Sequence, residues 1–135
     1  MKEKLREILK NEFIALKALL ASLDEQFKAL THNEVLKLEA IVPKIDSDCR
    51  EIAKWEVQRR TLLEGKELGV VITDFGDKQL DSDYRNIKKL VAAVEVQKES
   101  NDMLIRQGFA FTTKILNILN PDRTPKTYKS NGKRR

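Results

Sequence analysis

The sequence predicts an all-α protein, an antiparallel and coiled-coil-like bundle of three long helices at residues 2–30, 34–64 and 82–119. Only five glycines and three prolines occur in 135 residues, and 35% of the residues are charged. This composition is typical of long solvated helices. Apolar residues recur at alternating spacings of three and four along most of the chain, as they do in helices of a left-handed bundle. We expect a helical bundle domain at 1–119 and a flexible basic tail at 120–135.

The first helix rests on an apolar stripe that neither glycine nor proline interrupts between residues 2 and 30. Its members are Leu5, Leu9, Phe13, Leu16, Leu20, Leu23, Phe27 and Leu30. The next residues, 31–34, form a break in which Asn33 can cap the following helix. Because this turn is short, the second helix should run back antiparallel to the first.

The second helix is predicted at 34–64. Its expected stripe consists of Val35, Leu38, Val42, Ile45, Cys49 and Ile52. Pro43 removes one backbone hydrogen bond and should kink or split the helix near Val42. Trp55, at the flank of the stripe, is expected in the core or over its edge. Cys49 is the only cysteine, so it cannot form an intramolecular disulfide, and we expect it to be a small buried residue.

Residues 65–83 are the least regular stretch. Three glycines punctuate it, and the β-branched run at 70–73 disfavours a regular helix. We interpret it as a long connection that contains at most one short ordered piece, tucked against the bundle by Val71 and Phe75.

The third helix, at 82–119, should begin after Asp81 or Ser82, because either side chain can cap it. Lys98 and Asn101 occupy two later positions of its stripe, so the seam becomes polar there. The first half of the stripe consists of Tyr84, Ile87, Val91 and Val94.

Residues 101–119 are apolar on more than one side, although a surface helix needs one apolar stripe about 100° wide. One stripe contains Ile105, Gly108, Thr112, Ile115 and Leu119, a second contains Leu104, Phe111, Ile115 and Ile118, and Phe109 and Leu116 lie beyond the first. We expect one side to face the bundle and the other to face a partner. Two phases fit nearly equally well, so the inward side is left open. Gly108, in mid-helix, indicates a close helix approach or a hinge.

Two other interpretations of this stretch remain. A well-packed central helix is apolar all round and needs no partner. A membrane span is the weaker choice, because the run is shorter than the ~20 apolar residues that a span needs and contains Arg106 and Lys114.

The net charge of +5 belongs to the tail. Residues 121–135 contain six basic residues and one acidic residue, and the remaining chain contains 20 of each sign. A nucleic-acid-binding surface on the folded body is therefore poorly supported. The N-terminus lacks the apolar core and cleavage site of a signal peptide, and a lone cysteine suits a reducing compartment. We expect a cytoplasmic protein.

The sequence contains no pattern that supports catalysis. His32 is the only histidine, and no cysteine or carboxylate cluster accompanies it at metal-ligand spacing. A phosphate-binding glycine loop and a nucleophile elbow are both missing. We predict a binding protein that is not an enzyme and that uses neither a metal nor a cofactor.

The last quarter of the chain carries the most distinctive series of residues. It consists of Asn101, Leu104, Ile105, Phe111, the aliphatic run to Leu119, Pro121, Thr127, Tyr128 and Gly132. Through this series and its helical architecture, the chain resembles the FlgN family of flagellar export chaperones. It departs from the family pattern at Gly108, where a small hydroxyl residue or alanine is expected, and in the spacer at 120–126.

The resemblance implies a cytoplasmic chaperone that binds the C-terminal helical segment of hook–filament junction (hook-associated) proteins. Such a chaperone prevents premature assembly and delivers its cargo to the type III export gate. The implied cargo contacts are Leu104, Phe109, Phe111, Ile115, Leu116 and Ile118. Tyr128 matches a tail tyrosine associated with docking at the gate. The implied partners are proteins and not nucleic acid, and membrane association occurs only through the export apparatus.

Two alternatives are kept open. A self-associating helical protein, for example a homodimer, would use the second apolar stripe for its own pairing. A nucleic-acid or anionic-membrane binder would instead work through residues 121–135, and its binding would weaken steeply with salt.

Overall fold

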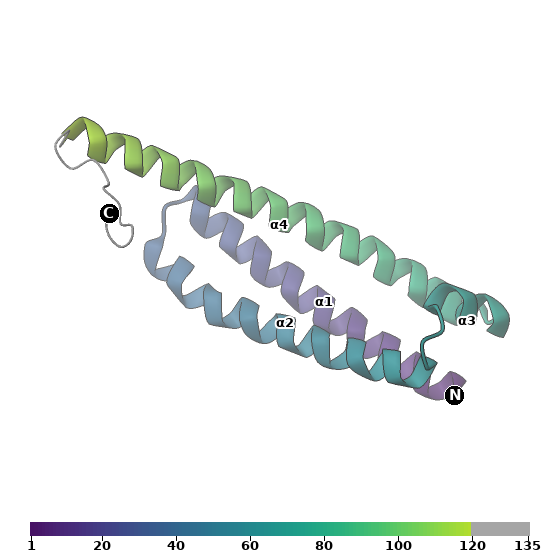
Figure 1. Cartoon of the computed structure of the whole chain (residues 1–135). Helices are drawn as coiled ribbons and strands as arrows, with labels where there is room; N and C mark the ends of the chain where they lie inside the picture. Colours follow the sequence, from purple (N-terminus) through teal and green to yellow (C-terminus); the bar gives the residue numbers. More distant parts are fainter. Residues whose placement is uncertain (120–135) are drawn as a thin grey trace, which may run out of the picture. The chain divides into compact units, whose positions relative to one another are not determined.

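The structure, a computed structural model, describes residues 1–119. This part of the chain folds into four helices and no strand: α1 (Lys2–Thr31), α2 (Val35–Leu63), α3 (Leu68–Phe75) and α4 (Lys78–Leu119) (Figure 1). The predicted all-α class is confirmed, with four helices in place of three. The chain divides into two units, Met1–Asn101 and Asp102–Arg135, which are described separately below.

Within the first unit, α1 and α2 run antiparallel. Lys44 Nζ lies 2.9 Å from Glu25 Oε1, near the end of α1. Arg59 Nη1 lies 2.6 Å from Glu12 Oε2, much earlier in α1. The residue numbers of the α1 partners decrease as those of the α2 residues increase. The two helices therefore lie side by side in opposite directions.

The first part of α4 runs parallel to α1. Asp77, directly before α4, contacts Lys2 and Arg6 at the start of α1. Asn101, 24 residues later, contacts the backbone of Leu23. In Figure 1, α1 accordingly lies between α2 and α4.

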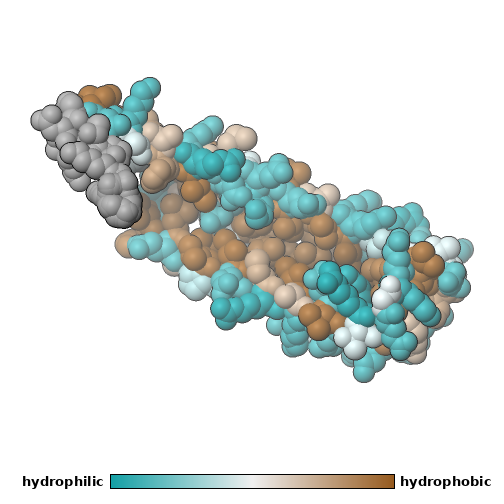
Figure 2. Space-filling view, viewed as in Figure 1, coloured by the Kyte–Doolittle hydropathy of each residue, from teal (hydrophilic) through white to brown (hydrophobic). Residues whose placement is uncertain are grey.

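The core of this unit consists of two apolar clusters. The first contains Leu5, Leu9, Leu16, Leu63, Val71, Ile72, Leu80 and Ile87, from all four helices. The second contains Leu19, Leu23 and Val94. Figure 2 shows apolar atoms gathered between the helices of this unit and hydrophilic residues over their outer sides. Helix α1 therefore supplies much of both clusters.

Helix α3 lies within the predicted irregular connection. Its β-branched run costs a few tenths of a kcal/mol per residue in a helix, but burial of Val71 and Ile72 contributes about 1.5–3 kcal/mol for each side chain. Packing therefore outweighs propensity. Val71 and Phe75 both pack against the first cluster, as the sequence suggested for a short ordered piece. Gly76 ends α3 with φ 62°, in the left-handed region that glycine adopts readily.

Helix α4 begins at Lys78, so the prediction that it starts after Asp81 or Ser82 was wrong. The cap is Asp77, whose Oδ1 accepts hydrogen bonds from the backbone N–H groups two and three residues later, at 2.8 and 3.1 Å. This is the N-capping arrangement that satisfies the free donors of a first helical turn. Because the capping residue lies earlier in the sequence than Asp81, the helix also begins earlier.

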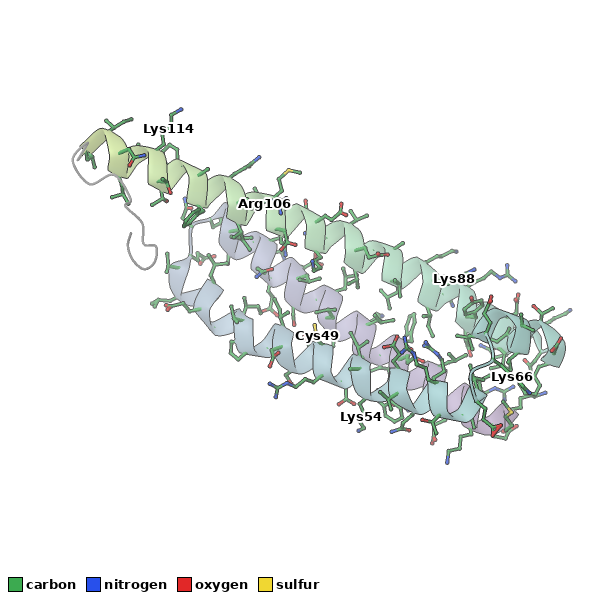
Figure 3. All side chains as sticks on the ribbon, in the orientation of Figure 1. Cys49, Lys54, Lys66, Lys88, Arg106 and Lys114 are labelled. Atoms are coloured by element: carbon green, nitrogen blue, oxygen red, sulfur yellow. The ribbon has the colours of Figure 1, made fainter. Side chains whose placement is uncertain are left out.

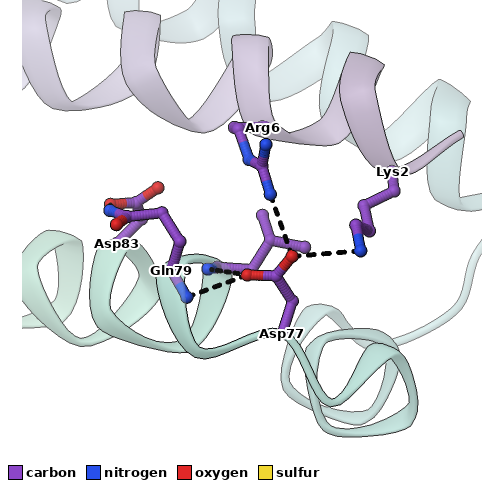
Figure 4. A network of polar contacts seen from close by, with 6 residues as sticks. Lys2, Arg6, Asp77, Gln79 and Asp83 are labelled. Atoms are coloured by element: carbon purple, nitrogen blue, oxygen red, sulfur yellow. Dashed lines mark hydrogen bonds and ion pairs between the residues drawn. The ribbon is translucent and has the colours of Figure 1, made fainter.

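The other carboxylate oxygen of Asp77 binds α1, as Figure 4 shows. Oδ2 lies 3.1 Å from Lys2 Nζ and 2.9 Å from Arg6 Nη2. The hydrogen bond from Lys2, followed by those from the backbone of Leu80 and Gln79, lowers the pKa of Asp77 to about 2. The same side chain thus caps α4 and ties it to α1.

Several predictions about α2 were wrong. Asn33 does not cap the helix: it adopts φ 53°, and Val35 begins α2 without a side-chain cap. The helix is continuous through Pro43, so the predicted split does not occur, while the alternative of a kink near Val42 stays a prediction. Among the stripe residues, Leu38, Ile45 and Ile52 are half-buried, whereas Val35, Val42 and Cys49 are exposed. The burial predicted for Cys49 was therefore wrong, because α2 buries a narrower stripe than its sequence offers.

Candidate functional site

The candidate site is the exposed apolar surface of residues 102–119, the C-terminal segment of α4. All of these residues are helical, and the sequence favours this because no proline occurs in the segment. Most of its large apolar side chains are exposed, from Ile115 at 38% to Leu119 at 76%. Nine other large apolar side chains of the described chain are exposed to a similar degree, but they are spread along the sequence from Met1 to Val96, and apolar side chains scattered over a surface are normal.

The apolar side chains of the segment form two ridges. At 100° per residue, the ridges lie about 140° apart around the helix. Ridge A consists of Leu104, Phe111 and Ile118, and ridge B consists of Ile105, Phe109 and Leu116. Ile115 and Leu119 lie between them. The complete apolar arc, from Ile118 to Phe109, covers about 180° of the helix.

Between the ridges, the surface is lowered at Gly108 and Thr112. A methyl group on Gly108 would meet no atom within 4 Å, so no close approach by another part of the described chain explains this glycine. The Thr112 hydroxyl donates a hydrogen bond to the Gly108 carbonyl at 2.9 Å. Arg106 and Lys114, labelled in Figure 3, lie outside the apolar arc.

All six predicted cargo contacts lie on this one surface. Phe109 is 74% exposed, Phe111 65% and Ile118 67%, while Leu104 is half-buried. Ile115 and Leu116 are also exposed. These positions are compatible with cargo binding, which stays a prediction. The predicted gate-docking residue, Tyr128, lies outside the described residues.

Asn101 ends the buried stripe of α4 immediately before this segment. It is 1% exposed, and its Nδ2 donates hydrogen bonds to the Leu23 carbonyl at 2.8 Å and to Gln26 Oε1 at 2.9 Å. Its Oδ1 accepts one from Gln97 Nε2 at 3.0 Å. The sequence located this polar position on the stripe, but it did not identify partners 75 and 78 residues away. Asn101 therefore fixes the position of α4 along α1.

Helices α1 and α4 differ in length beyond the contact of Leu23 with Asn101. Helix α1 ends at Thr31, eight residues after Leu23, whereas α4 continues for eighteen residues after Asn101. At 1.5 Å per residue, those stretches span about 12 and 27 Å. The C-terminal segment of α4 is therefore longer than the part of α1 that follows Leu23.

A buried ion pair in the first unit was not predicted from the sequence. Arg59 bonds Glu12 Oε2, and Glu12 Oε1 is buried without a hydrogen-bond partner. Burial raises the pKa of Glu12, and the charge of Arg59 partly offsets that effect. Spacing within either helix gives no sign of this pair, because it joins α1 and α2.

Residues 1–119 offer little else that could carry chemistry. No group of three or more His, Cys, Asp or Glu side chains in this range could hold a metal ion. His32 Nδ1 lies 2.7 Å from the Lys28 carbonyl at the end of α1. None of the described helices is long and apolar enough to cross a membrane. The exposed surface of residues 102–119 is therefore the strongest candidate.

Comparison with known proteins gives one match. The family model described as FlgN protein matches residues 1–135, the whole chain. No curated protein and no solved structure matches it.

Proposed function

Because the chain belongs to the FlgN family of flagellar export chaperones, we propose that its cargo is the C-terminal helical segment of hook–filament junction (hook-associated) proteins. The proposal includes the release of this cargo at the type III export gate and a cytoplasmic location before delivery. Bound cargo is held back from premature assembly.

The exposed apolar surface of residues 102–119 supports the cargo-binding role. Complete burial of five large apolar side chains such as Phe109, Phe111 and Ile118 would contribute on the order of 8–15 kcal/mol. Association costs about 4–15 kcal/mol in lost freedom of motion, so only part of that gain appears as affinity. An amphipathic cargo helix can occupy such a surface by helix-in-groove contact.

The energetic balance suits a chaperone that must release its cargo. A cargo segment that folds as it binds loses conformational entropy at that moment, which lowers the net affinity without reducing the contact area. Delivery would then need a second contact to bring the complex to the gate. We assign that contact to Tyr128, on the basis of the family resemblance.

The test is a calorimetric titration of the full chain with C-terminal segments of junction proteins from the same cell. We expect saturable binding with a negative heat-capacity change, the mark of apolar burial. A Phe109→Ser/Phe111→Ser variant should bind at least about tenfold more weakly, since each 1.4 kcal/mol lost is a factor of ten. Its fold should be unchanged, because both side chains are exposed.

The matched control is Val42→Ser/Val57→Ser in α2. These two side chains are 58% and 61% exposed, and their replacement should leave cargo affinity unchanged. Equal affinity of the Phe109→Ser/Phe111→Ser variant and the wild type would refute the location of the cargo site. Truncation after Asn120 should preserve cargo binding while removing Tyr128.

A failure of every junction-protein segment to bind would refute the cargo assignment. Sedimentation equilibrium would then decide whether the surface of residues 102–119 pairs with a second copy of the chain. Concentration-dependent mass that the Phe109→Ser/Phe111→Ser change abolishes would favour the self-associating alternative.

A further inference from the structure

The apolar surface changes width along α4. In the first unit, α4 fully buries one residue in every seven, namely Leu80, Ile87, Val94 and Asn101. One neighbouring heptad position in that unit is charged throughout, with Asp81, Lys88 and Glu95. In the segment, the same position holds Asp102 and then Phe109 and Leu116 of ridge B. At this position the helix therefore changes from charged to apolar after Asp102.

On the opposite side, a heptad position of mixed polarity becomes apolar throughout. Asp83, Leu90 and Gln97 occupy one heptad position in the first unit. The next three residues at that spacing form ridge A, Leu104, Phe111 and Ile118. One flank of the buried stripe is thus apolar from Leu104 onwards and the other from Phe109 onwards, while Gly108 and Ile115 continue the central seven-residue spacing of Asn101.

The width of the surface distinguishes between partner structures. One neighbouring helix covers an apolar stripe of about 100°. In a triangular array of three helices, the directions from one helix axis to its two neighbours differ by about 60°. The two neighbours together therefore cover about 160° of that helix's circumference. The segment presents about 180°. A single helix would leave either ridge A or ridge B in water.

We propose that the surface of residues 102–119 receives a pair of helices from one partner molecule and forms one third of an intermolecular three-helix bundle. One partner helix packs on ridge A and the second on ridge B, with their shared seam over Gly108 and Ile115. This inference rests on the proposed function and specifies the partner of the same surface: two amphipathic helices of the cargo. Arg106 and Lys114 lie outside the two edges of the apolar arc, so acidic residues at the outer edges of the partner helices would complement them.

The experiment compares two probes on the full chain, an intact junction protein and a peptide of its C-terminal helix alone. Two variants separate the ridges: Phe111→Ser/Ile118→Ser on ridge A and Phe109→Ser/Leu116→Ser on ridge B. The exposed α2 pair Val42→Ser/Val57→Ser is again the matched control, and circular dichroism checks the fold of each variant.

With the intact protein, we expect one partner per chaperone and at least about tenfold weaker binding for each ridge variant. The single-helix peptide should bind at least about tenfold more weakly than the intact protein. It should either saturate at about two peptides per chaperone or lose sensitivity to one ridge.

Three outcomes would overturn the inference. One is a single-helix peptide that binds one per chaperone with the full affinity of the intact protein; another is intact-protein binding that one ridge variant leaves unchanged. In both cases the chaperone function stands. Absence of any binding by the intact protein would instead refute the proposed function, and with it the helix pair.

Discussion

Replacing Asn101 with alanine tests how strongly one buried polar side chain holds α4 to α1. The change removes three hydrogen bonds, to Leu23, Gln26 and Gln97, each with a typical net contribution of about 1 kcal/mol. Both glutamine side chains are half-buried and can bond water instead, so we count about half of their contribution. A small cavity adds about 1 kcal/mol.

Alanine also favours the helix by about 0.5 kcal/mol relative to asparagine. The net expected loss is therefore about 2.5 kcal/mol, which corresponds to a fall in melting temperature of roughly 10–20 °C for a domain of this size. The matched control is Asn117→Ala, which makes the same chemical change at an exposed position of α4 and should gain the same helix propensity without the losses.

The assay is urea unfolding followed by circular dichroism and by the fluorescence of Trp55, the only tryptophan, which is half-buried on α2. The wild type and both variants should show equal dependence of the unfolding free energy on urea concentration. If Asn101→Ala and Asn117→Ala differ by less than about 0.5 kcal/mol, Asn101 does not fix α4 in the way described.

Three sets of substitutions and one chemical modification test other parts of the structure. Arg59→Leu should cost about 3–5 kcal/mol in urea unfolding, because Glu12 would remain buried and unpaired, whereas the double change Glu12→Leu/Arg59→Leu should recover most of that loss. Asp77 has a pKa lowered to about 2 from 3.8, so its charge stabilises the fold fully above pH 3.8 and that contribution is lost as the pH falls toward 2; the stability difference between wild type and Asp77→Asn, measured by thermal unfolding, should shrink across this window. Gly108→Ala should raise the helix content of α4 and stabilise it by up to ~1 kcal/mol, because the added methyl group meets no atom within 4 Å; unchanged or lower ellipticity would contradict this. Cys49 is exposed, so a thiol reagent should modify it in the native protein as fast as in urea, and native-state protection would contradict its placement.

Much of the fold could be predicted from the sequence because it depends on local pattern. The spacing of apolar residues and the near absence of glycine and proline placed α1 and α2 within a residue or two of their observed bounds. The apolar excess after Asn101 likewise indicated a surface with more to bury than its own bundle requires. The six cargo contacts that the resemblance implies all lie in that apolar stretch of one helix, and their role stays a prediction.

Contacts between distant residues required the tertiary structure. Asp77 caps α4 and also binds α1, and nothing near it in the sequence distinguishes it from Asp81 as a cap. In α2, the predicted stripe included Leu38, Ile45 and Ile52, which are half-buried, and Cys49, which is exposed; only the position of α1 decided which part of that stripe is covered. The β-branched run of α3 disfavours a helix locally, yet burial of Val71 and Ile72 outweighs that preference.

The sequence alone determined the helical class, the segment rich in unpaired apolar residues and the resemblance to FlgN, which the family match confirms. Only the tertiary structure decided where the intramolecular seam stops. In the sequence, Asn101 looks like any other polar residue, and only the structure shows that it donates hydrogen bonds to the Leu23 carbonyl and to Gln26. Spacing within a helix is encoded in neighbouring residues, whereas the end of an interface depends on how far the opposing helix reaches.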